Sequence, residues 1–192
     1  MKKLALAALA LTFSIGSMAG GGDYKVDAKK STIHWTGEKV TGKHEGFISA
    51  QGGEVKIDGK AISGKVTVDM ASITCTDLDA DYGAKLIGHL KSDDFFGVEK
   101  NPTANFVFKS WKKLDGDNYE ISGDLTVKGK SHPAKYKALV TTTEGGITIV
   151  GDLTFDRAKY DIRYGSGSFF DDLGDKTIYD EVKLKLNIVA TK

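Results

Sequence analysis

The side chains in this sequence that could carry chemistry are four histidines, one cysteine and several adjacent carboxylates. The stretch HLKSDDFF, residues 89–96, places a histidine, a lysine, two aspartates and two phenylalanines together. A metal site built from one element needs imidazoles at His-x-His or His-x-x-x-His spacing. Neither spacing occurs among the four histidines, which are His34, His44, His89 and His132. We therefore expect no metal site, although His44 and His89 could still meet in the folded chain.

Nucleophilic catalysis is not indicated either. The run Gly165-Ser166-Gly167 lacks the Gly-x-Ser-x-Gly spacing of a nucleophile elbow. Cys75 is the only cysteine, and a free cysteine usually serves as a small buried apolar residue. The neighbouring aspartates at 93–94 and 171–172 seldom converge on one substrate atom, because adjacent side chains point apart. We expect no catalytic residues and a protein that is not an enzyme.

The elements that must position these residues are mostly strands. Apolar and polar residues alternate in 65–70, 118–129 and 181–190, and this period of two is typical of strands with one buried face. Gly-rich and Asp-rich turns separate the strands, so sequential neighbours pair in antiparallel fashion. About eight such strands predict an all-β antiparallel barrel or sandwich, and closure is favoured because it removes free edges. Periodicity alone leaves open whether the interior is filled or hollow.

One segment breaks the strand pattern. Thr76 and Asp79 fit a capping box, and Leu78, Tyr82, Leu86 and Leu90 then recur every four residues. This spacing predicts an amphipathic helix near 76–91, inserted between strands and capping the barrel. His89 would lie near the helix C-terminus, where a cation is favoured. Phe95 and Phe96 would then anchor the segment that follows.

The order of motifs along the chain resembles the YceI-like family from about Tyr24 to Ala190. The motifs that carry the resemblance are HLKSDDFF, the Asn-Pro before a strand, GDLT, and the Phe-Asp-Arg of LTFDRAKYDIRYGSGSFFDDLGDKTIYDEV. The last segment is similar to the branch common in Bacteroidetes-type bacteria. The resemblance implies a lipocalin-like barrel that binds a polyisoprenoid, an isoprenoid quinone or a fatty amide in its interior. Storage, transport or stress protection would be its role.

The resemblance carries no fixed site set, so the pocket residues are inferred from the strand and helix patterns. Leu86, Leu90, Phe95 and Phe96 are expected to close one end. The expected wall and mouth residues are Trp35, Phe47, Phe106, Phe108, Phe155, Tyr164, Leu184 and Leu186. Polar contacts are assigned to His44, His89 and Arg157. No cofactor is expected beyond a bound isoprenoid or quinone lipid. A quinone-presenting redox accessory or an enzyme of the cell envelope is the alternative function.

The first residues predict export. A basic start, an apolar run too short to span a bilayer, and small residues at Ser17 and Ala19 are typical of a signal peptide, residues 1–19, cut after Ala19. Residues 20–192 would then form one YceI-like barrel domain in the periplasm or outside the cell. Removing Lys2 and Lys3 changes the net charge from +1 to about −1, which disfavours nucleic acid. No transmembrane segment follows. A homodimer and a transient membrane or redox partner remain open.

Overall fold

The computed structural model describes residues 21–192, and the predicted signal peptide with its cut after Ala19 lies outside this range. Nine strands make up most of the described chain. They are β1 (Gly22–Val26), β2 (Thr32–Lys39), β3 (Gly42–Asp58), β4 (Ala61–Asp69), β5 (Thr103–Lys113), β6 (Asn118–Val127), β7 (Lys130–Thr143), β8 (Gly146–Asp156) and β9 (Ile178–Thr191).

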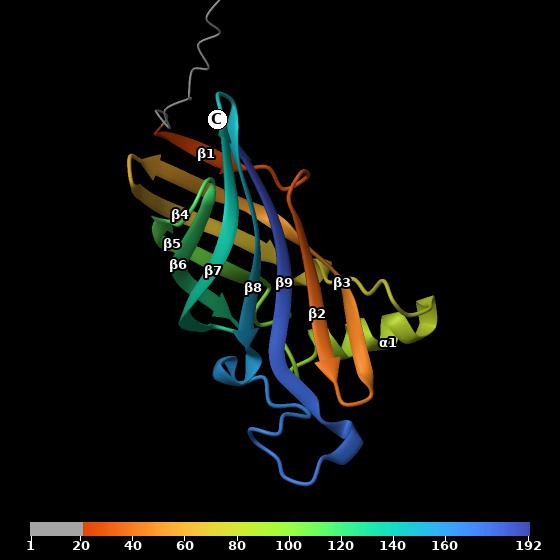
Figure 1. Cartoon of the computed structure of the whole chain (residues 1–192). Helices are drawn as coiled ribbons and strands as arrows, with labels where there is room; N and C mark the ends of the chain where they lie inside the picture. Colours follow the sequence, from red (N-terminus) through yellow and green to blue (C-terminus); the bar gives the residue numbers. More distant parts are fainter. Residues whose placement is uncertain (1–20) are drawn as a thin grey trace, which may run out of the picture.

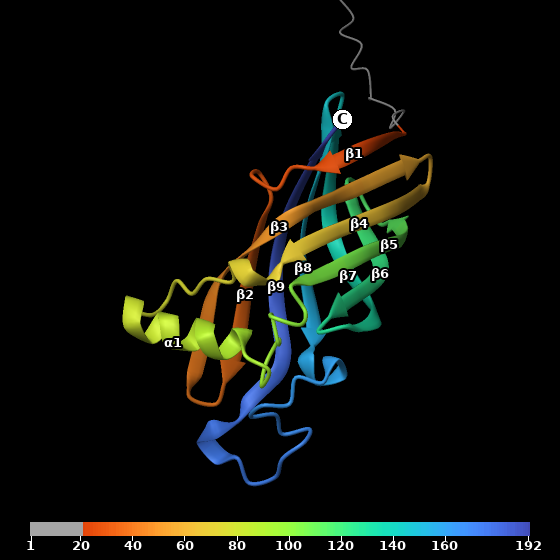
Figure 2. The same ribbon diagram turned by 180° about the vertical axis from the view of Figure 1, so that it is seen from behind.

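The strands form a closed antiparallel barrel, which confirms the predicted fold class (Figures 1 and 2). The ring runs β3-β2-β9-β8-β7-β6-β5-β4 and closes through the β3–β4 pairing. Short β1 is a ninth strand that pairs with the far half of β3 and with the end of β9. β1 and β2 therefore share one position in the ring, each filling one part of the space between β3 and β9.

Alternating side chains explain why these segments fold as strands. In β6 the buried positions are every second residue from Tyr119 to Val127. Gly123 is one of them, and a Cβ there would lie only 2.5 Å from the Phe106 ring, so a glycine lets the aromatic ring pack directly on the strand. Such close approach of a side chain is a common reason for glycine inside a strand.

Helix α1 (Ala80–Lys91) begins four residues later than the sequence predicted. Asp79 is its N-cap, because its carboxylate accepts the Tyr82 backbone N–H at 3.0 Å. Thr76 is instead bonded to β3, where its backbone N–H and its hydroxyl both donate to the Glu45 carbonyl. Among residues 21–192, no helix is long and apolar enough to cross a membrane.

The segment leading to α1, residues 73–77, runs along β3 in place of a strand. The Thr74 N–H donates to the Phe47 carbonyl, and the Thr76 N–H donates to the Glu45 carbonyl, both at 2.9 Å. Gly46 lies between them on β3, and a Cβ there would be 1.9 Å from the Thr74 carbonyl oxygen. The absence of a side chain at Gly46 is what permits this crossing. This segment leads into α1, whose C-terminal part lies against one end of the barrel (Figure 2).

Three short 3-10 helices complete the described chain: η1 (Met70–Ser72), η2 (Arg157–Tyr160) and η3 (Gly174–Lys176). η2 and η3 flank the long connection from β8 to β9, which projects below the barrel in Figure 1.

Candidate functional site

One end of the barrel interior is filled by side chains. Residues from β1, β3, β6, β7 and β8 are fully buried there and do not border a cavity: Tyr24, Val55, Ile121, Val140, Ile147 and Ile149. This packing forms a solid plug. A hollow barrel along its whole length is therefore excluded for this chain.

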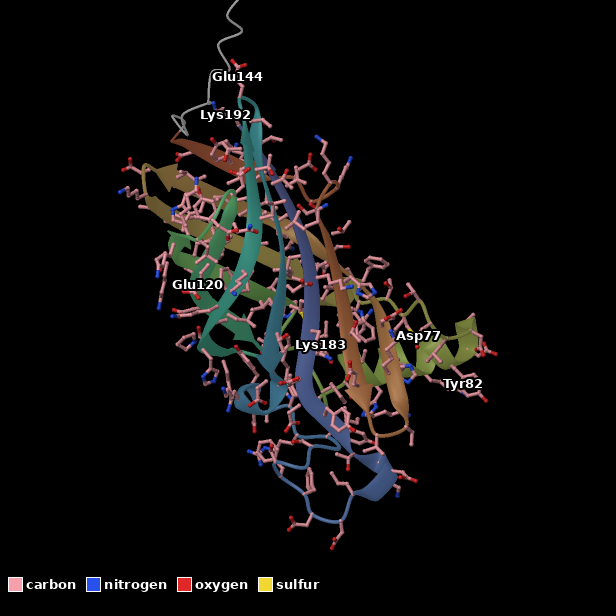
Figure 3. All side chains as sticks on the ribbon, in the orientation of Figure 1. Asp77, Tyr82, Glu120, Glu144, Lys183 and Lys192 are labelled. Atoms are coloured by element: carbon pink, nitrogen blue, oxygen red, sulfur yellow. The ribbon has the colours of Figure 1, made fainter. Side chains whose placement is uncertain are left out.

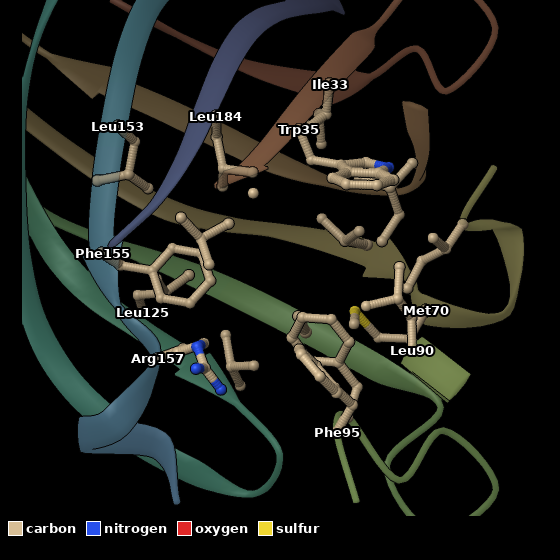
Figure 4. A pocket seen from close by; sticks show the side chains of 18 of the residues that line it. Ile33, Trp35, Met70, Leu90, Phe95, Leu125, Leu153, Phe155, Arg157 and Leu184 are labelled. Carbon is tan, nitrogen blue, oxygen red and sulfur yellow. The ribbon is translucent and has the colours of Figure 1, made fainter. Parts of the chain in front are cut away.

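The other half of the interior encloses a cavity of about 210 Å³. Figure 4 shows its wall, with Trp35 and Leu184 on neighbouring strands and Phe155 facing Phe95 across the space. Apolar cavities of about 150 Å³ already stay dry and hold benzene-sized molecules. The cavity is thus large enough for an apolar group.

Aromatic rings form much of the cavity wall. Phe106 contacts Phe108 edge-on, with ring centroids 5.1 Å apart, and contacts Tyr136 at 5.5 Å. Burial raises the pKa of the Tyr136 hydroxyl, which keeps that group neutral. Six of the predicted wall residues border the cavity: Trp35, Phe106, Phe108, Phe155, Leu184 and Leu186.

The segment at the C-terminus of α1 covers the cavity. Leu86, Leu90, Phe95 and Phe96, the residues predicted to close one end, all border it. The Phe95 ring lies 5.3 Å from the His89 ring and 5.8 Å from the Phe96 ring. The far end of α1 instead extends away from the barrel, where Tyr82 is exposed (Figure 3).

Polar groups gather where the cavity meets solvent. Glu38 and Lys39 of β2, His44 of β3 and His89 of α1 border this end and are partly exposed. Tyr179 of β9 also borders it and is 48% exposed. We call this set of five residues the mouth. An apolar interior with a polar mouth is the arrangement that orients an amphiphile.

A carboxylate that was not predicted as a site residue, Asp77, supports the mouth. Asp77 accepts a hydrogen bond from the His44 ring at 2.9 Å and another from the Glu45 backbone N–H at 2.9 Å. The Cys75 thiol donates to the same carboxylate at 3.2 Å. Burial raises the pKa of Asp77, but these hydrogen bonds outweigh it and bring the pKa to about 2. Asp77 is therefore ionised at neutral pH.

Arg157 borders the cavity but uses its guanidinium to hold the chain together. It is 1% exposed, and its Nη2 lies 3.2 Å from Asp180 Oδ1. Its N–H groups also donate at 2.9–3.2 Å to four backbone carbonyls, those of Ile162, Tyr164, Ile178 and Tyr179. Four hydrogen bonds to carbonyls and one ion pair therefore surround the guanidinium, and Asp180 Oδ1 itself accepts no hydrogen bond from the described residues. Arg157 thus joins the β8–β9 connection to the start of β9.

Two expected wall residues lie elsewhere. Phe47 is on the outer face of β3, 46% exposed, with its ring edge on His34 at 5.1 Å. Its neighbour Ile48 faces inward, so strand alternation places Phe47 outside. Tyr164 is also outside the cavity, in the β8–β9 connection, where its ring contacts His89 at 4.3 Å.

Other cavity residues were not assigned to the site from sequence. They occupy inward positions on the strands or follow a strand directly: Ile33, Ile48, Val66, Val68, Met70, Ile73, Ala104, Leu125, Val127, Leu153 and Ile178. The alternation in 65–70 and 118–129 was the available signal for those on β4 and β6. Within residues 21–192, no group of three or more His, Cys, Asp or Glu side chains could hold a metal ion.

The YceI-like domain pattern matches residues 24–190. The chain belongs to the YceI-like family. It is 35% identical over 147 residues to Protein YceI of Escherichia coli O157:H7, covering 72% of each chain. It is 34% identical over 149 residues to a UPF0312 protein of Pseudomonas aeruginosa (strain LESB58), covering 72% of this chain and 73% of that one.

Two solved structures share the fold. BcnA of Burkholderia cenocepacia superposes with a TM-score of 0.67 at 28% identity, over 86% of this chain and 99% of BcnA. A polyisoprenoid binding domain from Saccharophagus degradans superposes with a TM-score of 0.62 at 16% identity, over 88% of this chain and 97% of that domain. At 16% identity the likeness concerns the fold alone.

Proposed function

We propose that the protein binds the apolar chain of a long-chain amphiphile, a polyisoprenoid, isoprenoid quinone or fatty amide, in the cavity and shields it from water. The observation that carries the proposal is the cavity of about 210 Å³, whose lining away from the mouth is apolar except for Asn105, Tyr136 and Arg157. Each buried methylene contributes about 0.8 kcal/mol, so an isoprenoid tail needs no strong polar contact to bind.

Membership in the YceI-like family supports the same ligand class. The structural neighbour from Saccharophagus degradans is described as polyisoprenoid binding, and its fold is the one found here. The side chains at the mouth form no arrangement of nucleophile, base and orienting group of the kind that acyl transfer requires. A binding protein accounts for the cavity without any chemical step.

Extraction of a native ligand tests the proposal. The protein is purified from its own cell envelope, extracted with organic solvent, and the extract is analysed by mass spectrometry. We expect about one long-chain lipid per chain. The delipidated protein should then regain a ligand from a set of isoprenoid alcohols and quinones, with a rise in melting temperature. An empty extract together with no shift for any of these lipids would refute the proposal.

Export is a separate part of the proposal. The basic and apolar start of the sequence supports a signal peptide, and small residues at Ser17 and Ala19 support a cut after Ala19. The protein would then act in the periplasm or outside the cell. N-terminal sequencing of the native protein should begin at Gly20, whereas an intact Met1 would contradict export.

A further inference from the structure

His44 occupies an inward position on β3 at the mouth of the cavity. Its register partner on β2 is Gly37, and a Cβ at Gly37 would meet no atom within 4 Å. Open space therefore lies beside the inward position of His44, where the cavity meets solvent. This space is where the head of an amphiphile would lie if its tail filled the apolar interior.

Asp77 determines which nitrogen of His44 carries the proton. The Asp77 carboxylate is ionised, and an ionised carboxylate can only accept hydrogen bonds. Because Asp77 Oδ2 lies 2.9 Å from His44 Nδ1, the hydrogen must be on Nδ1. The neutral imidazole then carries its lone pair on Nε2, which is a hydrogen-bond acceptor.

His44 Nε2 has no hydrogen-bond partner among residues 21–192. The other carboxylate of the mouth, Glu38, already accepts a hydrogen bond. Lys183 donates to Glu38 Oε1 at 2.7 Å. His89, the other imidazole of the mouth, is packed between the rings of Phe95 and Tyr164. His44 Nε2 is thus the acceptor of the mouth that is oriented by a second residue and remains available to a ligand.

We propose that His44 Nε2 accepts a hydrogen bond from a hydroxyl group on the head of the bound lipid. The site therefore selects long-chain alcohols and hydroquinones over ethers, esters and quinones with the same tail, which accept hydrogen bonds but cannot donate one. This inference rests on the proposed function, because the tail in the cavity is what brings the head to His44.

Two probes with one tail test the selection. Geranylgeraniol carries a hydroxyl donor, and its methyl ether carries an oxygen that only accepts. Binding of each to the delipidated protein is measured at pH 8.5, two units above the ordinary imidazole pKa of about 6.5. We expect the alcohol to bind about five- to tenfold more tightly than the ether, which corresponds to one net hydrogen bond.

Asp77→Asn separates this role from a structural one. The amide oxygen can keep the bond from the Glu45 N–H, while the amide nitrogen replaces Oδ2 and donates to His44 Nδ1. The hydrogen of the imidazole then moves to Nε2, which becomes a donor. Because both probes can accept from a donor, the affinity ratio should fall to about one. Asp124→Asn, which changes a carboxylate paired with Lys109 outside the cavity lining, should keep the wild-type ratio.

The outcomes separate this inference from the proposed function. Equal binding of the two probes by the wild-type protein would overturn the role of His44 and leave tail binding intact. If Asp77→Asn keeps the wild-type ratio of affinities for the alcohol and the ether, the role of His44 is also overturned. Tighter binding of geranylgeranyl phosphate than of geranylgeraniol would overturn it in favour of an anion site at Lys39. If neither the alcohol nor the ether binds, the cavity does not hold an isoprenoid tail, and the proposed function fails for that part of the ligand class.

Discussion

Ala104→Leu should strengthen the fold and weaken lipid binding at the same time. Ala104 is a buried residue of β5 that borders the cavity. Leucine adds three carbon atoms, and these would enter space that a ligand needs. If three ligand methylenes lose their burial at about 0.8 kcal/mol each, binding weakens by about 2.4 kcal/mol, or roughly 60-fold. The free protein gains about 0.5–2 kcal/mol, as cavity-filling substitutions commonly do.

Two measurements on the same variant check this prediction. Urea denaturation of the delipidated protein gives the free energy of unfolding, and titration with geranylgeraniol gives the affinity. Ala138→Leu is the matched control, since Ala138 is 3% exposed but does not border the cavity. A Cβ at Gly151 would already lie 3.0 Å from the Ala138 Cβ, so the control should be overpacked and lose about 1–3 kcal/mol. Unchanged affinity in Ala104→Leu would refute the assignment of the cavity as the binding site.

Three further substitutions test other parts of the structure. Gly46→Ala should lower the free energy of unfolding by about 2–3 kcal/mol, because its methyl group would overlap the Thr74 carbonyl oxygen. A urea midpoint equal to that of the wild type would contradict the close passage of residues 73–77 over Gly46. Arg157→Met should lower the free energy of unfolding, measured by urea denaturation, by about 3–5 kcal/mol, because Asp180 loses its cation. Arg157→Lys should not restore that stability, since one ammonium cannot reach four carbonyls. The pKa of Asp77 is lowered to about 2 in the folded protein, so its stabilising effect of about 1–2 kcal/mol is present above pH 4 and is lost as the pH falls towards 2. Urea denaturation between pH 5 and 2 should show that the wild type loses stability more steeply than Asp77→Asn. Equal pH dependence of stability in the two proteins would show that Asp77 ionisation does not stabilise the fold.

The alternation of inward and outward residues along the strands explains which parts of the fold could be predicted from the sequence. In β9 every second residue from Val182 to Ile188 faces the cavity, as the alternation of 181–190 indicated. The same rule would have placed Phe47 outside, because Ile48 and Ala50 are the buried residues of that part of β3. Phe47 was assigned to the wall because it is aromatic, and residue type alone cannot tell which face of a strand a ring lies on.

Contacts between distant segments explain what sequence patterns could not show. Asp77 reaches His44 across 33 positions, and the pair forms only because residues 73–77 pass close over Gly46. No local spacing encodes that crossing. The start of α1 was ambiguous for a related reason, since both Thr76 and Asp79 are residues that can cap a helix. Thr76 has its partner on β3, and this tertiary contact leaves the cap to Asp79.

The position that β1 and β2 share in the ring has a consequence for the order of folding. Both strands pair with β9, and Ser31 just before β2 is hydrogen-bonded to Val189, 158 positions away. Pairing over such separations is slow, because the loop between the strands must lose its freedom before the contacts form. The seam beside β9 should therefore be among the last parts of the barrel to close. Until it closes, Trp35 and its neighbours are open to water, and the fluorescence of Trp35 should report that late step.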